Sequence, residues 1–189
     1  ETNLYKKDLN LFTIMIIGGS QGAKIFDTLI NETILSISKS CPINVIHQTS
    51  RENINYLKNF YKINNIASNV FTFDQNLNEL MKQSDLCISR SGASSLAEMS
   101  LMNVPFIAIP LPSSKDNHQY ENAKYYYDKD CCWIIDQKKF DKKKFEELLL
   151  KISKKDEDYV AKKENLKKLN YQNTWNNVNQ NLLEILNEN

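Results

Sequence analysis

Two turns rich in glycine and serine carry the groups best suited to bind an anion. Gly18–Ala23 (GGSQGA) and Ser89–Glu98 (SRSGASSLAE) each follow an apolar run and precede a segment of helical periodicity. Glycines let a ligand approach the backbone closely, and a helix start offers free amides and a partial positive charge. Ser20, Ser94 and Ser95 add hydroxyl groups, so both turns suit a diphosphate. The first turn is neither GxGxxG nor a Walker loop, and a tight strand-to-helix turn explains it equally well.

Glu98 lies one helical turn beyond the serines of the second motif. A carboxylate at that position has the acceptors to bind both hydroxyls of a ribose diol. The alternative is a capping box, in which Glu98 reaches back to the amide of Ser95 or of a neighbour. The sequence leaves both interpretations open.

A third polar segment, Asp116–Ala123 (DNHQYENA), follows Pro110-Leu111-Pro112 and contains His118, Gln119 and Asn122. Side-chain amides suit sugar hydroxyls because each amide offers both a donor and an acceptor. The alternative is a solvated helix start capped by Asp116.

The elements expected around these segments alternate between strands and helices. Apolar, β-branched runs predict strands, and apolar residues at helical spacing predict the helices between them. Six alternations with short connections predict an α/β fold with a doubly wound, parallel, Rossmann-like sheet, in which ligands bind at the carboxyl ends of the strands. The chain from about 141 onwards is expected to be helical, with a last apolar face at Trp175, Val178, Leu182, Leu183 and Leu186. The strands are expected at 12–17, 43–47, 70–73, 86–89, 106–109 and 132–135, and the helices at 25–37, 51–61, 77–83, 93–102 and 117–127.

A fourth motif, His47–Ser50 (HQTS), follows the second expected strand and is by itself most simply a capped helix start. With it, the chain shows GGSQGA, HQT, RSGA before a helix containing Ala-Glu, and PLP before D-HQ--NA, in that order. This ordered set, over roughly residues 12–137, resembles MurG-type UDP-N-acetylglucosamine transferases. Ser50 stands where the family usually has glycine. The resemblance implies a GT-B architecture of two Rossmann-like halves, of which residues 1–189 form the C-terminal, donor-binding half.

The resemblance also assigns roles to the residues of the motifs. It implies that Ser20 and the amides of Ser94 and Ser95 hold the diphosphate, and that Glu98 binds the ribose hydroxyls. It implies a further contact between phosphate and either His118 or Gln119.

The remaining assignments concern the two ends of the donor. Gln119, with Asn122 nearby, is expected to bind the N-acetylglucosamine hydroxyls. The backbone of Phe73 and Asp74 is expected to receive the uracil, and Asp74 replaces an isoleucine that is usual in the family. Arg90 matches the family position and serves either phosphate binding or structure.

The activity that the resemblance implies is inverting transfer of N-acetylglucosamine from UDP-N-acetylglucosamine to a lipid-linked muramyl-pentapeptide, in peptidoglycan synthesis. The acceptor site, the membrane-facing patch and the catalytic base are then expected in an N-terminal half outside this chain, so the chain alone is expected to be inactive. The full enzyme is expected on the cytoplasmic face of the inner membrane as a peripheral protein. Two rivals are the donor-binding subunit of a split lipid-linked transferase and a non-catalytic module that binds nucleotide sugars.

Two Asp-x-Asp strings, Asp128–Asp130 and Asp156–Asp158, match the motif that binds metal in a different glycosyltransferase fold. Both are interpreted as solvated turns or helix caps. His47 and His118 lack ligand spacing with a cysteine. We therefore expect no metal and no cofactor, with helix N-termini meeting the charge of the diphosphate.

Charge and cysteine content narrow the class of protein. Twenty-four basic residues against twenty-three acidic ones give a net charge of +1, which offers no sequence-wide attraction for nucleic acid. Cys41, Cys87, Cys131 and Cys132 lack paired CxxC spacing, which favours free thiols over metal ligands or disulfides. The apolar runs are far shorter than the roughly 20 residues of a membrane-spanning helix.

Overall fold

Strand β1 (Phe12–Ile17) shows how the sheet is covered on both faces. All six residues are buried. Ile14 and Ile16 belong to one hydrophobic core, whereas Met15 and Ile17 belong to a second core. Successive side chains of a strand point to opposite faces, so an unbroken apolar run requires helices on both sides of the sheet.

The computed structural model describes residues 8, 10–18 and 24–172. The described strands form a six-stranded parallel sheet in the order β3-β2-β1-β4-β5-β6. This order confirms the predicted doubly wound fold, and the order reverses between β1 and β4. The other strands are β2 (Ile43–Gln48), β3 (Ala67–Phe71), β4 (Leu86–Ser89), β5 (Phe106–Ala108) and β6 (Cys132–Ile134).

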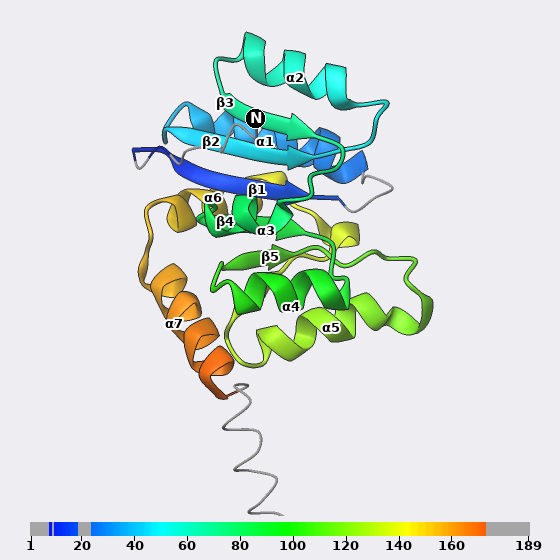
Figure 1. Ribbon diagram of the computed structural model, residues 1–189, viewed down its shortest axis with the longest axis vertical. Helices are drawn as coiled ribbons and strands as arrows, with labels where there is room; N and C mark the ends of the chain where they lie inside the picture. The colour runs from blue at the N-terminus through cyan, green and yellow to red at the C-terminus, as the bar shows by residue number, and fades with distance from the viewer. Residues whose placement is uncertain (1–7, 9, 19–23, 173–189) are drawn as a thin grey trace, which may run out of the picture.

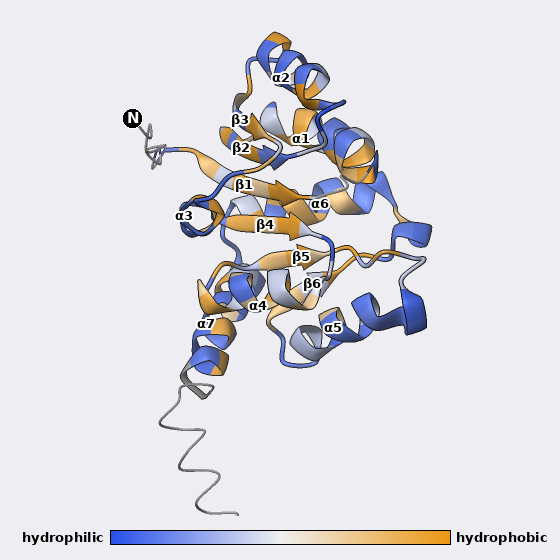
Figure 2. Ribbon diagram, turned by 45° about the vertical axis from the view of Figure 1, so that its right-hand side comes forward, coloured by the Kyte–Doolittle hydropathy of each residue, from blue (hydrophilic) through white to orange (hydrophobic). Residues whose placement is uncertain are grey.

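Helices cover each face of the sheet (Figures 1 and 2). The first core packs the sheet against a π-helix (Phe26–Ile30), α1 (Asn31–Ser38), α2 (Ile54–Ile63) and α6 (Lys142–Ser153). The second core packs it against α3 (Leu77–Lys82), α4 (Ala93–Leu101), α5 (His118–Tyr127) and α7 (Glu157–Gln172). Short 3-10 turns lie at Lys115–Asn117 and Gln137–Lys139. No helix in the described part of the chain is long and apolar enough to cross a membrane.

Most predicted elements are confirmed to within a residue or two, with two larger differences. The strand expected at 70–73 is Ala67–Phe71, so Phe73 lies beyond its end. The helix expected from residue 51 begins at Ile54, because residues 51–53 form a turn. The apolar face expected from Trp175 onwards lies outside the described residues. All four cysteines are free, and only Cys41 is not buried.

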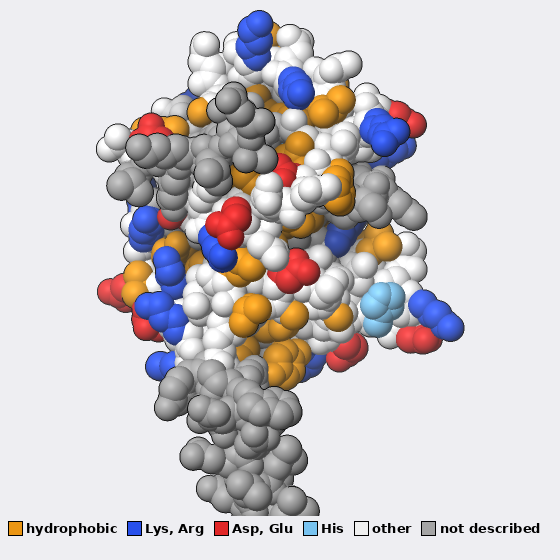
Figure 3. All heavy atoms as spheres, in the orientation of Figure 1, with side chains coloured by type: hydrophobic (Ala, Val, Ile, Leu, Met, Phe, Trp, Pro, Cys, Tyr) orange, Lys and Arg blue, Asp and Glu red, His pale blue; other side chains and the backbone are white. Residues whose placement is uncertain are grey.

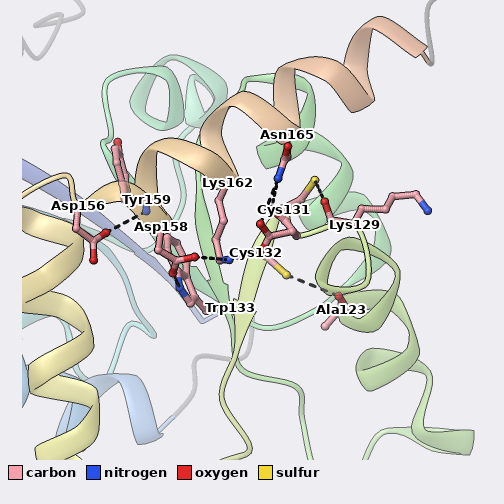
Figure 4. A network of polar contacts seen from close by, with 11 residues as sticks. Ala123, Lys129, Cys131, Cys132, Trp133, Asp156, Asp158, Tyr159, Lys162 and Asn165 are labelled. Carbon is pink, nitrogen blue, oxygen red and sulfur yellow. Dashed lines mark hydrogen bonds and ion pairs between the residues drawn. The ribbon is translucent and has the colours of Figure 1, made fainter.

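Helix α7 is fastened to β6 by a polar network (Figure 4). The indole Nε1 of Trp133 donates to Asp158 Oδ2 at 2.7 Å. The nearly buried Lys162 ammonium donates to Asp158 Oδ1 at 2.9 Å and to Asp130 Oδ1 at 2.5 Å, and lies 5.2 Å from the centroid of the Trp133 ring. Asp156 caps α7 by accepting from the amide of Tyr159. The Asp-x-Asp strings thus meet at one lysine. Their interpretation as solvated turns or caps is confirmed, because residues 128–130 form an exposed turn and Asp156 caps α7, whereas the ion pairs with Lys162 were not predicted.

We expect Lys162→Met to lower the free energy of unfolding by about 1–3 kcal/mol, because two charge-assisted hydrogen bonds are lost while the aliphatic stem is kept. Urea unfolding measures the change. Lys168→Met, at an exposed position of the same helix, is the control and should stay within about 0.5 kcal/mol of the wild type. Equal effects of the two substitutions would contradict a structural role for the network.

Candidate functional site

The predicted site residues gather at the edge of the sheet where the parallel strands end (Figure 1). β1 and β4 are neighbours, and Ile17 pairs with Ser89 in register. The amide of Arg90 donates to the carbonyl of Ile17 at 3.4 Å. The two glycine-containing motifs therefore leave the sheet from adjacent strands, at its switch point. Ser20 itself lies outside the described residues.

Helix α4 begins at this edge with an open first turn. Gly92 is the N-cap in an extended conformation, with no side-chain cap. The amides of Ala93, Ser94 and Ser95 are among those that a helix cannot pair internally, and no described side chain accepts from them. A Cβ on Gly92 would meet only Ser95 Oγ, at 3.9 Å, and φ is −64°. The fold itself does not require glycine at 92, whereas a ligand approaching these amides does.

Glu98 lies one turn further along α4 and is half-buried. Its carboxylate has no hydrogen bond or ion pair with another described residue. The capping-box alternative is wrong, because the N-cap is Gly92, which places Ser95 rather than Glu98 at the reciprocal position. The ribose assignment of Glu98 stays a prediction.

Gln119 and Asn122 form hydrogen bonds that join α5 to the segments that follow β4 and β5. Gln119 Oε1 accepts from the amides of Ser91 at 3.2 Å and Leu111 at 2.9 Å. Asn122 Nδ2 donates to the carbonyl of Ser91 at 3.0 Å. The sequence left ligand contacts and a solvated helix start as alternatives for this segment, and the structure shows that both side chains join α5 to the ends of β4 and β5. The Gln119 amide nitrogen and the Asn122 amide oxygen are the groups left to bind a ligand.

Arg90 supports the same exits. Its guanidinium donates to the carbonyls of Ile109 at 3.1 Å and Pro110 at 3.3 Å, and it lies 5.2 Å from the centre of the Phe26 ring. Burial lowers the pKa of Arg90. Of the two roles expected for this residue, these contacts supply the structural one.

His118 opens α5 on the exposed side of the site. Its Nδ1 lies 2.7 Å from the carbonyl oxygen of Lys115. Asp116 and Asn117 precede it with φ of 48° and 56°, in the left-handed region. The expected cap by Asp116 is wrong, because Asn117 occupies the N-cap position and no side chain caps the helix. The phosphate contact expected for His118 stays a prediction.

Phe73 and Asp74 follow β3 at the other end of the site. Phe73 is 76% exposed. Asp74 Oδ1 accepts from the amide of Asn76 at 2.7 Å, so the Asp74 side chain is bound within its own turn. A nucleobase bound by the backbone of this turn does not need the Asp74 side chain as a partner. β3 lies three strand spacings from β4, or about 14 Å. The predicted groups thus span a long, shallow row.

A buried carboxylate that the sequence did not single out organises the helix after the first glycine-rich turn. Asp27, in the π-helix, accepts from Thr49 Oγ1 at 3.0 Å and from Asn53 Nδ2 at 2.6 Å, and lies 3.3 Å from His47 Nε2. The interpretation of His47–Ser50 as a capped helix start is therefore wrong. The N-cap of α2 is Asn53, and its side chain binds Asp27 rather than the helix.

Two buried polar side chains flank His47 on opposite sides of its ring. Its Nδ1 lies 2.8 Å from the Tyr61 hydroxyl, which donates to Asn31 Oδ1 at 2.7 Å, and its Nε2 faces Asp27. Burial lowers the pKa of His47, although Asp27 opposes this effect. Burial also raises the pKa of Asp27, but the contacts from His47, Asn53 and Thr49 outweigh it, and the pKa lies below its ordinary value of 3.8.

We expect Asp27→Asn to lower the free energy of unfolding by about 1–3 kcal/mol, because an amide nitrogen then faces hydroxyl and amide donors in a buried site. Urea unfolding at neutral pH measures it. Glu32→Gln, which removes an exposed ion pair with Lys142 from α1, is the control and should change stability by less than about 1 kcal/mol.

The pH dependence of stability distinguishes a contribution from the ionised Asp27 carboxylate from one that comes only from the packing of its side chain. A lowered pKa contributes stability above pH 3.8 that is lost as the pH falls through the folded-state pKa. The difference between wild type and Asp27→Asn should therefore shrink below pH 3.8. A difference in stability that stays constant with pH would contradict an ionised Asp27 carboxylate as the acceptor of these hydrogen bonds.

The strand order defines the class of protein as a Rossmann-like domain, a class that binds ligands at the switch point of its sheet. Charged side chains of both signs are interspersed over the face drawn in Figure 3. Residues 13–178 match the glycosyltransferase family 28 C-terminal domain. The chain belongs to this family, and its sheet and helices are those of one Rossmann-like half of a GT-B glycosyltransferase.

Relatives and solved structures agree with the class. The chain is 42% identical, over 98% of its length, to a Pelagibacter ubique protein named UDP-N-acetylglucosamine–N-acetylmuramyl-(pentapeptide) pyrophosphoryl-undecaprenol N-acetylglucosamine transferase, and covers 52% of it. A Rickettsia massiliae protein of the same name is 38% identical, with 84% of this chain and 43% of that protein covered. The chain spans about half the length of these curated relatives.

Among solved structures, Acinetobacter baumannii MurG superposes with a TM-score of 0.68 and 22% identity over 85% of this chain and 51% of that one. The C-terminal CMP-Kdo binding domain of WaaA from the same organism gives a TM-score of 0.63 and 13% identity, covering 85% of this chain and 89% of that domain. At these identities the likeness shows the shared fold.

Proposed function

We propose that this chain is the donor-binding half of an inverting transferase that moves N-acetylglucosamine from UDP-N-acetylglucosamine to a lipid-linked muramyl-pentapeptide. Family membership and the printed names of the relatives support the reaction. The observation that carries the role of this half is the open first turn of α4, where glycine is present without a structural need for it.

In this proposal the donor lies along the strand ends. The amides of Ser94 and Ser95, with the Ser20 turn from the adjacent strand, hold the diphosphate and meet the charge that develops on it as the sugar leaves. The Glu98 carboxylate accepts from the ribose hydroxyls. The Gln119 amide nitrogen donates to a sugar hydroxyl.

The nucleobase end and the rest of the enzyme complete the proposal. The backbone at Phe73 and Asp74 receives the uracil. The sheet and its helices, about 12–137, form the binding unit, and helices α6 and α7 follow it in the described part of the chain. An N-terminal half supplies the acceptor site, the catalytic base and attachment to the cytoplasmic face of the inner membrane.

Gly92→Ala tests the proposed function directly. We expect UDP affinity to fall at least tenfold, because a methyl group blocks the approach to the α4 amides, while stability changes by no more than about 1 kcal/mol. Calorimetry with UDP in EDTA measures affinity, and urea unfolding measures stability.

Ala97→Gly, on an exposed position of α4, should give the opposite pattern. It should cost about 1 kcal/mol of stability and leave UDP affinity unchanged. Gly92→Ala with wild-type affinity would refute a diphosphate at this turn, as would binding that EDTA abolishes and manganese restores.

Gln119→Glu separates the two roles of Gln119. The carboxylate keeps an acceptor for the amides of Ser91 and Leu111, so the fold should be kept, but the NH2 group is lost. We expect UDP-N-acetylglucosamine affinity to fall about five- to fifteenfold through the loss of one hydrogen bond of about 1–1.5 kcal/mol, and UDP affinity to fall less, because only the added charge acts on the diphosphate. Equal loss for both ligands would show that the side chain acts only by holding the strand exits.

A further inference from the structure

A pocket of about 340 Å³ lies beside the proposed donor site. Its lining residues lie where β5 and β6 end and α5 begins; Figure 2 shows these three elements. Two stretches of the chain meet there: residues 110–120, which run from the turn after β5 to the start of α5, and the turn after β6. The lining residues are Pro110, Leu111, Pro112, Asn117, Tyr120, Asp136 and Lys138.

The position of the pocket follows from the order of the strands. The proposed uracil site lies at β3, the diphosphate amides at β4, and Gln119 between the exits of β4 and β5. Leu111 gives its amide to Gln119 and also lines the pocket. The pocket is therefore the next space along the row, just beyond the sugar end of the donor. In a transferase, that space adjoins the group that receives the sugar.

The lining is amphipathic. Pro110, Leu111 and Pro112 form an apolar wall, and the Tyr120 ring is 40% exposed beside it. The polar groups are the amide of Asn117, one carboxylate and one ammonium. Lys138 has no ion pair with another described residue, whereas Asp136 Oδ1 accepts from the backbone amide of Lys138 at 2.9 Å.

This combination fits a short peptide better than a second phosphate or sugar. Apolar walls of proline, leucine and tyrosine pack small side chains. An unpaired ammonium matches a terminal carboxylate, and a carboxylate with one free oxygen matches a peptide N–H. A diphosphate carries at least two negative charges, which exceed the single charge of Lys138 and would be repelled by Asp136, whereas Lys138 alone balances one terminal carboxylate.

We propose that this pocket binds the peptide of the muramyl-pentapeptide acceptor, with Lys138 pairing with its terminal carboxylate. The inference rests on the proposed function and extends it, because it gives the donor half a share in recognising the acceptor. Tyr120 packs on the peptide, and the acceptor hydroxyl is thereby brought toward the sugar bound at Gln119.

The test uses the 189-residue chain with saturating UDP-N-acetylglucosamine and a soluble N-acetylmuramyl-pentapeptide as the probe. In nuclear magnetic resonance titrations to millimolar peptide, we expect the amide signals of Asn117, Tyr120 and Lys138 to shift. Lys138→Ala should weaken peptide binding about three- to fivefold, the size of a partly exposed ion pair. The same peptide with a C-terminal amide should bind the wild type as weakly as the acid binds Lys138→Ala.

Lys139→Ala is the matched control, an exposed lysine of the same turn that does not line the pocket. It should leave peptide binding unchanged, and neither variant should change UDP-N-acetylglucosamine affinity. Absence of shifts at the pocket, or equal binding of acid and amide peptides, would overturn the inference. Weaker donor binding by Lys138→Ala would overturn it too and assign the pocket to the sugar. Failure of the chain to bind UDP-N-acetylglucosamine at all would instead count against the proposed function.

Discussion

The pairing of β1 with β4 is the constraint from which the site follows. Four residue pairs, from Ile14–Leu86 to Ile17–Ser89, set these strands side by side although about seventy residues separate them in sequence. Chain connections then leave β1 toward one face and β4 toward the other, so a gap opens between the two turns at the strand ends. Both turns contain glycine and serine, and a slip of the register would separate them. The open amides of α4 are useful only because this pairing places them at that gap.

Side chains do the rest of the positioning. The short strands β4 and β5 end with backbone groups that the sheet no longer pairs, and buried backbone groups need partners. Gln119, Asn122 and Arg90 supply them, through the amides of Ser91 and Leu111 and the carbonyls of Ser91, Ile109 and Pro110. The start of α5, which is expected to bind the ligand, thus also stabilises the ends of β4 and β5.

Local signals in the sequence were enough for the sheet and for the places where the polar motifs lie. The apolar run of β1 and the glycine turns after β1 and β4 predicted both. Contacts between distant segments could not be predicted in the same way. The contacts of Asp27 depend on a π-helix that the apolar spacing does not predict, and its partner Thr49 comes from the turn after β2. Lys162 pairs with Asp130, in the turn before β6, and with Asp158, in its own helix, and the two Asp-x-Asp strings do not predict either pair. The pocket beyond β5 joins residues 110–120 to the turn after β6, and the composition of both stretches is ordinary.

Polar groups that maintain the fold differ from those of the proposed site in whether they have hydrogen-bond partners within the protein. Asp27 and Glu98 are both carboxylates on helices that follow glycine-containing turns, and the sequence alone favoured Glu98 only through its spacing. In the structure Asp27 is 4% exposed and accepts from two side chains, so it has nothing left to offer a ligand. Glu98 is accessible, and none of the described residues engages its carboxylate. The same contrast holds between the capped start of α6, where Asp141 accepts from Lys144, and the uncapped start of α4. The groups that the fold leaves unsatisfied are therefore the ones with which a ligand can best be bound.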